Sequence, residues 1–176
     1  MIFTETPLKG AFVIDLEPLV DERGFFARSY CQRDFAAHGI NFEIVQSNLS
    51  FNLKAGTLRG LHFQKEPAGE AKLVRCVQGS MYDVIVDLRA QSPTYGRSFN
   101  VELTAVNHRA LFIPMDLAHG FQTLTDQTMV SYEIGEYYCV EAASGIRYDD
   151  PVLGLSWPLP VCVVSERDLA WPPLAS

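Results

Sequence analysis

The sequence predicts an all-β sandwich or barrel. About ten short segments of alternating apolar and polar residues follow one another at intervals near ten residues, with turn residues between them. Only two short stretches have a helical pattern, so βαβ units are not expected. The 176 residues, 48% hydrophobic and 20% charged, are typical of one globular domain. We therefore expect a single domain over residues 1–176.

The first forty residues combine two strands with one helix. Residues 11–16 alternate as a strand, and residues 21–26 form a charged turn that opens into a second strand. Arg23 in this turn could bind a phosphate, with Phe25 or Phe26 under a base, or the turn could be a solvated hairpin. Residues 32–39 predict a helix, because Gly39 lies where a C-cap would fall.

The remaining chain is predicted to be mostly β. A short helix is expected at the end, with Ser165 as its N-cap and the pair Pro172-Pro173 behind it. The expected strands are 43–50, 57–64, 72–77, 81–88, 99–104, 111–114, 116–121 and 129–134.

Composition excludes several classes of protein. A net charge of -7 argues against a surface that binds nucleic acid. No apolar run approaches the length of a membrane span, and the N-terminus shows no signal-peptide pattern. Cys31, Cys76, Cys139 and Cys162 lack paired spacing, so we interpret them as reduced thiols of a cytoplasmic protein. Cys76 and Cys162 lie in apolar stretches and are expected in the core.

Strand 57–64 carries the first candidate for chemistry. Strict alternation would place Gly60, His62 and Gln64 on one face and Arg59, Leu61 and Phe63 on the other. A glycine inside a strand marks the close approach of a ligand or another backbone. The alternative is a buried core histidine beside a β-bulge.

A second polar row lies in strand 43–50. Gln46, Asn48 and Ser50 share one face of that strand. Such a row is either a solvent-exposed face or a hydrogen-bonding wall, and alternation alone does not distinguish them.

Two histidines, His62 and His119, could face one barrel lumen, which raises the question of a metal. Gln64 stands where a second histidine of a His-x-His pair would be, and the later carboxylates are Glu66 and Glu70. Two nitrogen ligands are too few for a tight site, so we expect no metal.

Acid-base chemistry is the alternative to a metal. A histidine is a natural proton acceptor near neutral pH. Lys72 could stabilise an oxyanion, and Tyr132 could return a proton from the other side. Equally, Lys72 could lie at a strand end with its amine in water, and Tyr132 could be a half-buried core aromatic.

An ordered series of motifs resembles the dTDP-4-dehydrorhamnose 3,5-epimerase family. The motifs are 21–26 (DERGFF), 45–50 (VQSNLS), 58–64 (LRGLHFQ), 72–76 (KLVRC), 83–89 (DVIVDLR), 92–94 (SPT), 113–114 (IP), 118–121 (AHGF), 137–138 (YY), 149–151 (DDP) and 157–158 (WP). The resemblance implies a cupin-like jelly-roll barrel with short flanking helices, a homodimer, and no metal or organic cofactor. It also implies an isomerase of deoxysugar biosynthesis that inverts C3, C5 or both in a nucleotide-linked 4-keto-6-deoxy sugar.

The resemblance also implies roles for individual residues. His62 corresponds to the base, Asp168 to its orienting carboxylate, Lys72 to the cation at the enolate oxygen and Tyr132 to the proton donor. Further residues correspond to substrate contacts or lumen polar groups: Arg23 and Arg59 at the diphosphate, Gln46, Asn48, Phe25 or Phe26, Tyr138 and Arg167 around the nucleotide, and His119 with Asp83 as its partner.

Three residues depart from the family pattern and leave the substrate open. Arg28 stands near the nucleotide where glutamate is frequent, Ala143 stands where a glutamate follows the double tyrosine, and Glu70 replaces a common glutamine. The chemistry is untouched, but a single-centre epimerase or a CDP-linked sugar stays possible. A binding module without turnover and a metal-dependent cupin oxygenase are the alternatives from other classes.

Overall fold

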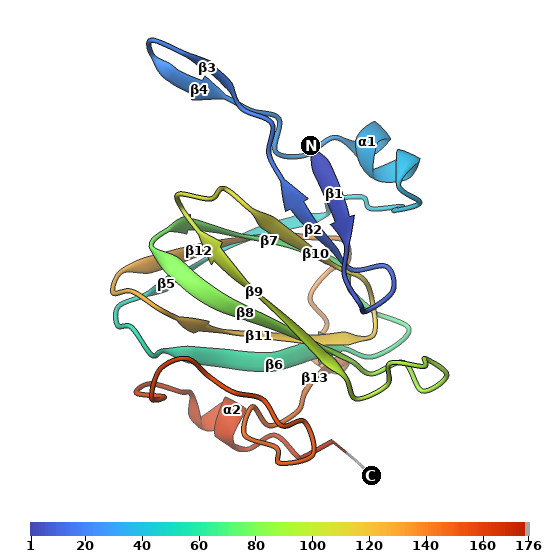
Figure 1. Cartoon of the computed structure of the whole chain (residues 1–176). Helices are drawn as coiled ribbons and strands as arrows, with labels where there is room; N and C mark the ends of the chain where they lie inside the picture. The colour runs from blue at the N-terminus through green and yellow to red at the C-terminus, as the bar shows by residue number, and fades with distance from the viewer. Residues whose placement is uncertain (175–176) are drawn as a thin grey trace.

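A computed structural model describes residues 1–174 as two antiparallel sheets packed face to face (Figure 1). Its elements are β1 (Ile2–Glu5), β2 (Phe12–Asp15), β3 (Leu19–Asp21), β4 (Gly24–Phe26), α1 (Gln32–Ala37), β5 (Gln46–Asn52), β6 (Leu58–Gln64), β7 (Lys72–Gln78), β8 (Ser80–Asp87), β9 (Ser98–Thr104), β10 (Ala110–Ile113), β11 (Leu117–Thr123), β12 (Thr128–Ile134), β13 (Ala143–Gly145) and α2 (Glu166–Leu169).

The two sheets form a jelly roll around an apolar centre. One sheet has the strand order β1-β2-β10-β7-β12-β5, and the other has the order β13-β6-β11-β8-β9. Val74 and Val130 from the first sheet pack against Ile85, Leu103 and other apolar residues of the second. Burial of these inward faces is the main driving force for the pairing of the sheets. The cupin-like fold expected from the sequence is confirmed.

Each sheet is also covered on its outer face. Helix α1 places Phe35 against the six-stranded sheet, in a cluster with Phe42, Leu73 and Phe112. The chain after β13 covers the five-stranded sheet, where Ile146 and other apolar residues pack against β6 and β8. Helix α2 lies beside β6 (Figure 1). No helix within residues 1–174 is long and apolar enough to cross a membrane.

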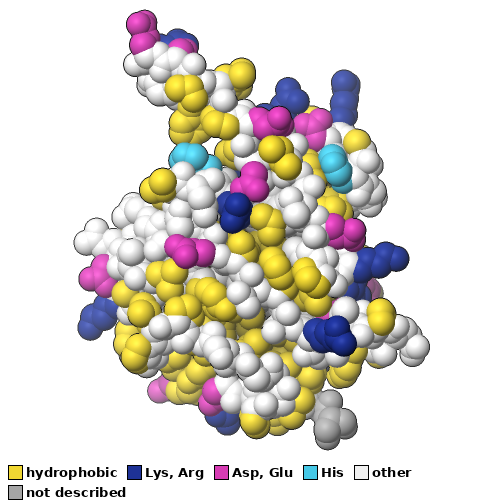
Figure 2. Space-filling model, in the orientation of Figure 1, with side chains coloured by type: hydrophobic (Ala, Val, Ile, Leu, Met, Phe, Trp, Pro, Cys, Tyr) yellow, Lys and Arg dark blue, Asp and Glu magenta, His cyan; other side chains and the backbone are white. Residues whose placement is uncertain are grey.

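Strands β3 and β4 form a separate hairpin that projects from the body of the molecule (Figure 1). Its large apolar side chains are exposed, with 74% of Phe26 and 76% of Val20 accessible to solvent. Figure 2 shows these apolar atoms along the stem of the projection. An isolated two-stranded hairpin is marginally stable in water, so this one is short of packing partners.

Most strand predictions are confirmed. β1, β3 and β13 were not expected, because three or four residues show too little alternation to stand out. β5 begins at Gln46, three residues later than predicted. Cys162 is exposed and donates to the carbonyl of Ala55, so its prediction as a core residue was wrong, whereas Cys76 is buried as expected.

Asp87 at the end of β8 organises the loop that leads to β9. Its buried carboxylate accepts hydrogen bonds from the Arg89 guanidinium at 2.8 and 2.7 Å and from the hydroxyls of Ser92 and Thr94, each at 2.6 Å. Burial alone would raise the pKa of Asp87, but these hydrogen bonds outweigh burial and hold the pKa far below its ordinary value.

We expect Asp87→Asn to lower the free energy of unfolding by about 3 kcal/mol at pH 7, because it leaves buried donors without their anion. A carboxyl with a depressed folded-state pKa stabilises the protein above its unfolded pKa of about 3.9, and this stabilisation is lost as the pH falls through the folded-state pKa. Urea unfolding between pH 7 and pH 3 should therefore show the difference from wild type shrinking in acid.

Asp15→Asn is the matched control, since Asp15 makes a similar pair with Arg109 at 2.8 Å but is one-third exposed. It should cost no more than about 1 kcal/mol at any pH. Equal effects of the two substitutions would show that the Asp87 network adds nothing beyond a surface ion pair.

Candidate active site

A pocket of about 380 Å³ opens between the two sheets at the end of the barrel beside α2. That volume suits a small organic ligand. Strands of both sheets contribute side chains to it, so it has two opposed walls. Its polar and charged lining residues are Asn48, Ser50, Arg59, His62, Gln64, Glu70, Lys72, His119, Tyr132, Tyr138, Ser144, Ser165, Arg167 and Asp168.

A bulge in β6 brings Arg59 and His62 to the same side of the strand. His62 pairs with His119 of β11 and Arg59 pairs with Phe121, so three steps along β6 match two along β11. Both residues line the pocket, whereas Leu61 packs into the outer cluster. The expected alternation, with Arg59 opposite His62, was therefore wrong.

The bulge depends on a close approach of two backbones at glycine. A Cβ atom on Gly60 would lie 2.5 Å from the Cα of Gly120, and Gly60 has a φ of +127°. Only glycine tolerates both conditions. The sequence analysis expected either a ligand or another backbone to approach Gly60, and the structure shows the backbone of β11 there.

His62 is held by a carboxylate from the C-terminal helix. Its Nε2 lies 2.6 Å from Asp168 Oδ1, and the other carboxylate oxygen accepts the Gly60 N–H at 3.2 Å. Ser165 caps α2 by accepting the Asp168 N–H at 3.1 Å, which fixes the start of the helix. With Nε2 bound to the carboxylate, Nδ1 of His62 is the nitrogen that can accept a proton.

The Asp168 carboxylate is an anion throughout the neutral range. Burial by itself would raise its pKa, but hydrogen bonds from His62, the Gly60 amide and Ser165 outweigh burial and lower the pKa. An ionised Asp168 orients the imidazole of His62.

Tyr132 faces this dyad from the other sheet. It lies on β12, and its ring meets the His119 ring edge to face, with centroids 6.2 Å apart. Burial, and secondly the nearby Asp83 carboxylate, raise the pKa of Tyr132. Its hydroxyl therefore stays protonated and can donate.

His119 is bound from behind by a second carboxylate. Its Nε2 lies 2.5 Å from Oδ1 of Asp83, which is fully buried on β8. The partnership that the resemblance implied for these two residues is present. His119 lines the pocket and Asp83 does not, so the carboxylate holds the ring in a fixed orientation from outside the lining.

Lys72 begins β7 and points into the pocket, where it forms an ion pair with Glu70 at 2.8 Å. The loop between β6 and β7 that carries Glu70 is tied down by Gln64. The buried Gln64 amide donates to the carbonyls of Ala68 and Tyr137 and accepts the N–H of Cys139. Gln64 therefore fixes two loops beside the pocket.

Basic and aromatic side chains surround the mouth of the pocket. Arg59 is oriented by a 2.7 Å hydrogen bond from its Nε to Asn52, and Arg167 lies over the Trp171 ring at 5.2 Å. Tyr138 approaches Arg167 with its hydroxyl at 3.4 Å, and its backbone N–H donates to Gln46. Gln46 thus supports Tyr138 from outside the lining.

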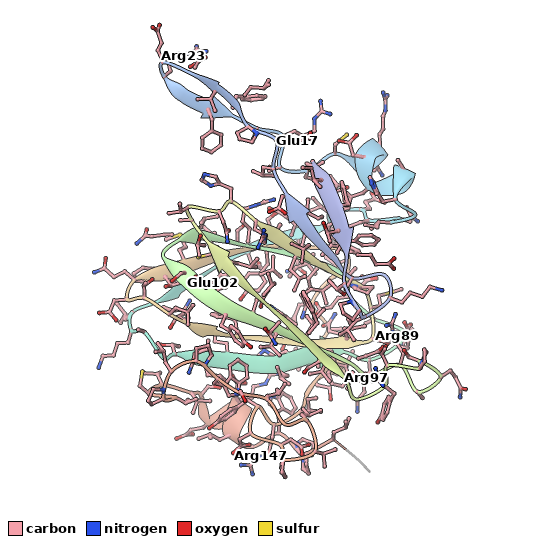
Figure 3. All side chains as sticks on the ribbon, viewed as in Figure 1. Glu17, Arg23, Arg89, Arg97, Glu102 and Arg147 are labelled. Carbon is pink, nitrogen blue, oxygen red and sulfur yellow. The ribbon has the colours of Figure 1, made fainter. Side chains whose placement is uncertain are left out.

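Three predicted substrate-binding residues lie away from this pocket in the same chain. Arg23 is at the tip of the projecting hairpin, paired with Asp21, and 85% of its side chain is exposed (Figure 3). Phe25 lies on β4 and packs near His108. Arg28 follows the hairpin and lies 3.5 Å from Asp34. All three are absent from the lining of the pocket.

The sequence prediction missed several supporting residues. Glu70 was noted only as a candidate metal carboxylate and as a departure from the family pattern. Its position two residues before Lys72 was the signal that could have connected the two, although β7 begins only at Lys72. The chemistry of Gln64 was considered only as a glutamine in place of a metal-binding histidine.

Within residues 1–174, no group of three or more histidine, cysteine, aspartate or glutamate side chains is arranged to hold a metal.

The arrangement supports proton transfer. A carboxylate-oriented histidine lies on one wall, a protonated tyrosine lies on the other, and a lysine lies in the same pocket. A base and an acid on opposite walls can act on opposite faces of a flat intermediate between them.

Known proteins resemble the chain over nearly its whole length. A model of the dTDP-4-dehydrorhamnose 3,5-epimerase family matches residues 5–176. The dTDP-4-dehydrorhamnose 3,5-epimerase of Methanothermobacter thermautotrophicus is 43% identical over 98% of this chain and 94% of its own. A dTDP-4-dehydrorhamnose 3-epimerase of Streptomyces niveus is 36% identical over 92% of this chain and 78% of its own.

A solved structure shares the fold closely. The crystal structure of dTDP-4-dehydrorhamnose 3,5-epimerase from Bacillus anthracis, with TDP and PPi bound, superposes with a TM-score of 0.95. It is 40% identical and the match covers 98% of this chain and 99% of that one. The chain belongs to the dTDP-4-dehydrorhamnose 3,5-epimerase family, and it is an epimerase.

Proposed function

We propose that the protein inverts C3 and C5 of dTDP-4-keto-6-deoxyglucose in deoxysugar biosynthesis. The observation that carries this proposal is the pairing of the His62–Asp168 dyad on one wall with Tyr132 on the other. The C4 ketone acidifies the hydrogens on both neighbouring carbons, so one base and one acid serve both centres in turn.

The first half of each inversion is proton removal. Nδ1 of His62 takes the proton from the carbon next to the ketone, and Asp168 stabilises the resulting imidazolium. The electron pair of the C–H bond moves into the ring and the C4 oxygen becomes an enolate. The Lys72 ammonium stabilises the charge on that oxygen.

The second half is proton return from the other face. Tyr132 donates its hydroxyl proton to the planar carbon, the C4 ketone re-forms, and the configuration of that carbon is inverted. The tyrosinate then recovers a proton from solvent and His62 releases the one it took. Each inversion is therefore balanced in protons and needs no cofactor.

Basic groups at the mouth suit the diphosphate of a nucleotide sugar. Arg59 and Arg167 offer charge-assisted hydrogen bonds, and Tyr138 and Asn48 offer surfaces for the nucleoside. The relatives that act on dTDP sugars support this substrate. A single-centre reaction is the second candidate, because one similar relative is a 3-epimerase.

We also propose a cytoplasmic homodimer in which the hairpin of one protomer reaches the pocket of the other. The exposed apolar residues of the hairpin need a cover, and its arginine lies far from the pocket of its own chain. In the pocket of the partner protomer, Arg23 would lie at the diphosphate and Phe25 at the nucleotide base, with Arg28 nearby. All four cysteines are free thiols, which suits a reducing compartment.

Proton NMR in deuterium oxide tests the reaction directly. With dTDP-4-keto-6-deoxyglucose, we expect the C3 and C5 proton signals to disappear as both positions exchange with solvent. Loss of one signal would identify a single-centre epimerase. If neither signal changes with this sugar or its CDP-linked analogue, the proposed function is wrong.

Two substitutions separate the base from the acid. His62→Ala should slow all exchange by about 10²-fold to 10⁴-fold, because it removes the general base. The Tyr132→Phe variant should still exchange the hydrogens of the substrate with solvent, since His62 can return a deuteron to the face from which it removed the proton. The product should therefore keep its original configuration. His38→Ala, which changes an exposed histidine outside this pocket, is the control. Inversion by Tyr132→Phe at the wild-type rate would remove Tyr132 from the mechanism.

Mixing two defective variants tests the exchange of hairpins. His62→Ala protomers keep the hairpin and Arg23→Ala protomers keep the base, so a mixed dimer has one pocket with both. If the subunits exchange freely, about half of the dimers are mixed, and each mixed dimer has one complete pocket out of two. Activity at low substrate concentration should therefore rise to about a quarter of the wild-type value. A monomer in light scattering would contradict the dimer, and a mixture no more active than its parts would place the hairpin in its own protomer.

A further inference from the structure

Glu70 lies in the pocket with no assigned role. It belongs to the connection between β6 and β7, and its carboxylate contacts Lys72 at 2.8 Å. Both side chains are only 10% exposed. The chain before Lys72 thus supplies a carboxylate directly to the cation that stabilises the enolate.

The backbone around Glu70 is held from several sides. Gln64 binds the carbonyl of Ala68 at 2.9 Å, and the Ala71 carbonyl accepts the N–H of Gly135 at 2.9 Å. Gly69 is buried, and a Cβ there would lie 2.8 Å from the Glu66 carboxylate. The loop is therefore fixed on both sides of Glu70, and its carboxylate presents a fixed acceptor.

Stability alone does not explain this ion pair. A buried pair of charges gains little net free energy, because the loss of hydration offsets the attraction. Lysine has a flexible four-carbon stem and a point charge, so it needs a fixed partner to occupy one position. The pair fits the requirement that catalytic groups be placed before the substrate arrives.

We propose that Glu70 is a positioning residue that holds the Lys72 ammonium in place for the enolate oxygen. It acts through one ion-pair contact with the Lys72 ammonium at 2.8 Å, which leaves the other side of the ammonium to meet the substrate. This role rests on the proposed function of the pocket. The negative charge of Glu70 is secondary to the position of its oxygen.

Kinetics of Glu70→Ala and Glu70→Gln separate position from charge. Glu70→Ala should lower kcat about tenfold to a hundredfold with KM changed less than about threefold, because the lost contact matters most when the enolate forms. Glu70→Gln keeps an oxygen acceptor and should restore kcat to within about threefold of wild type.

Glu66→Ala is the matched control, since Glu66 is an exposed glutamate in the same loop and lies outside the pocket. It should leave kcat unchanged. Wild-type kcat in Glu70→Ala would overturn the proposal, as would a Glu70→Gln variant as slow as Glu70→Ala, which would assign the effect to charge.

Lysine side-chain NMR provides a readout that needs no substrate. The chain has four lysines, Lys9, Lys54, Lys65 and Lys72, so the ammonium signals are few, and Lys72→Arg assigns the relevant one. We expect a rigid Lys72 ammonium in wild type and Glu70→Gln and a mobile one in Glu70→Ala. Equal mobility in all three would refute the positioning role even if the substrate proved to be different.

Discussion

The geometry of the site depends on the contact between the backbones of β6 and β11 at Gly60 and Gly120. Because no side chain separates the two strands there, β6 can take in an extra residue and bulge. Beyond the bulge, the side chains of β6 therefore point to the face opposite to the one that simple alternation from Arg59 predicts. Arg59 and His62 then face the pocket together, so one strand supplies both an arginine and the histidine that we propose as the base.

A second dependence links the two ends of the fold. His62 lies on β6, but the carboxylate that orients its ring comes from α2, more than a hundred residues later. Asp168 binds both the imidazole and the amide of Gly60, so it joins the helix to the bulge itself. The two carboxylate oxygens thus connect the His62 imidazole with the backbone bulge that directs it into the pocket.

Local patterns in the sequence were sufficient for the strands but not for their irregularities. Period-two alternation identified β6, β7 and β12, and the Ser165 cap identified α2, since these signals are local. The bulge depends on a glycine in another strand, and the dyad depends on docking of the C-terminal segment, so neither could be worked out from spacing. The resemblance supplied the Asp168 assignment. It did not reveal that Arg23 and Phe25 lie outside the pocket of their own chain.

The late position of Asp168 has a consequence for biosynthesis on the ribosome. Strands β1 to β13 supply the barrel, His62 and Tyr132, and they emerge before α2 does. His62 is therefore synthesised long before the carboxylate that binds it. A chain that stops short of α2 therefore lacks the contact between His62 and Asp168. The orientation of His62 thus depends on a segment that is synthesised after all thirteen strands.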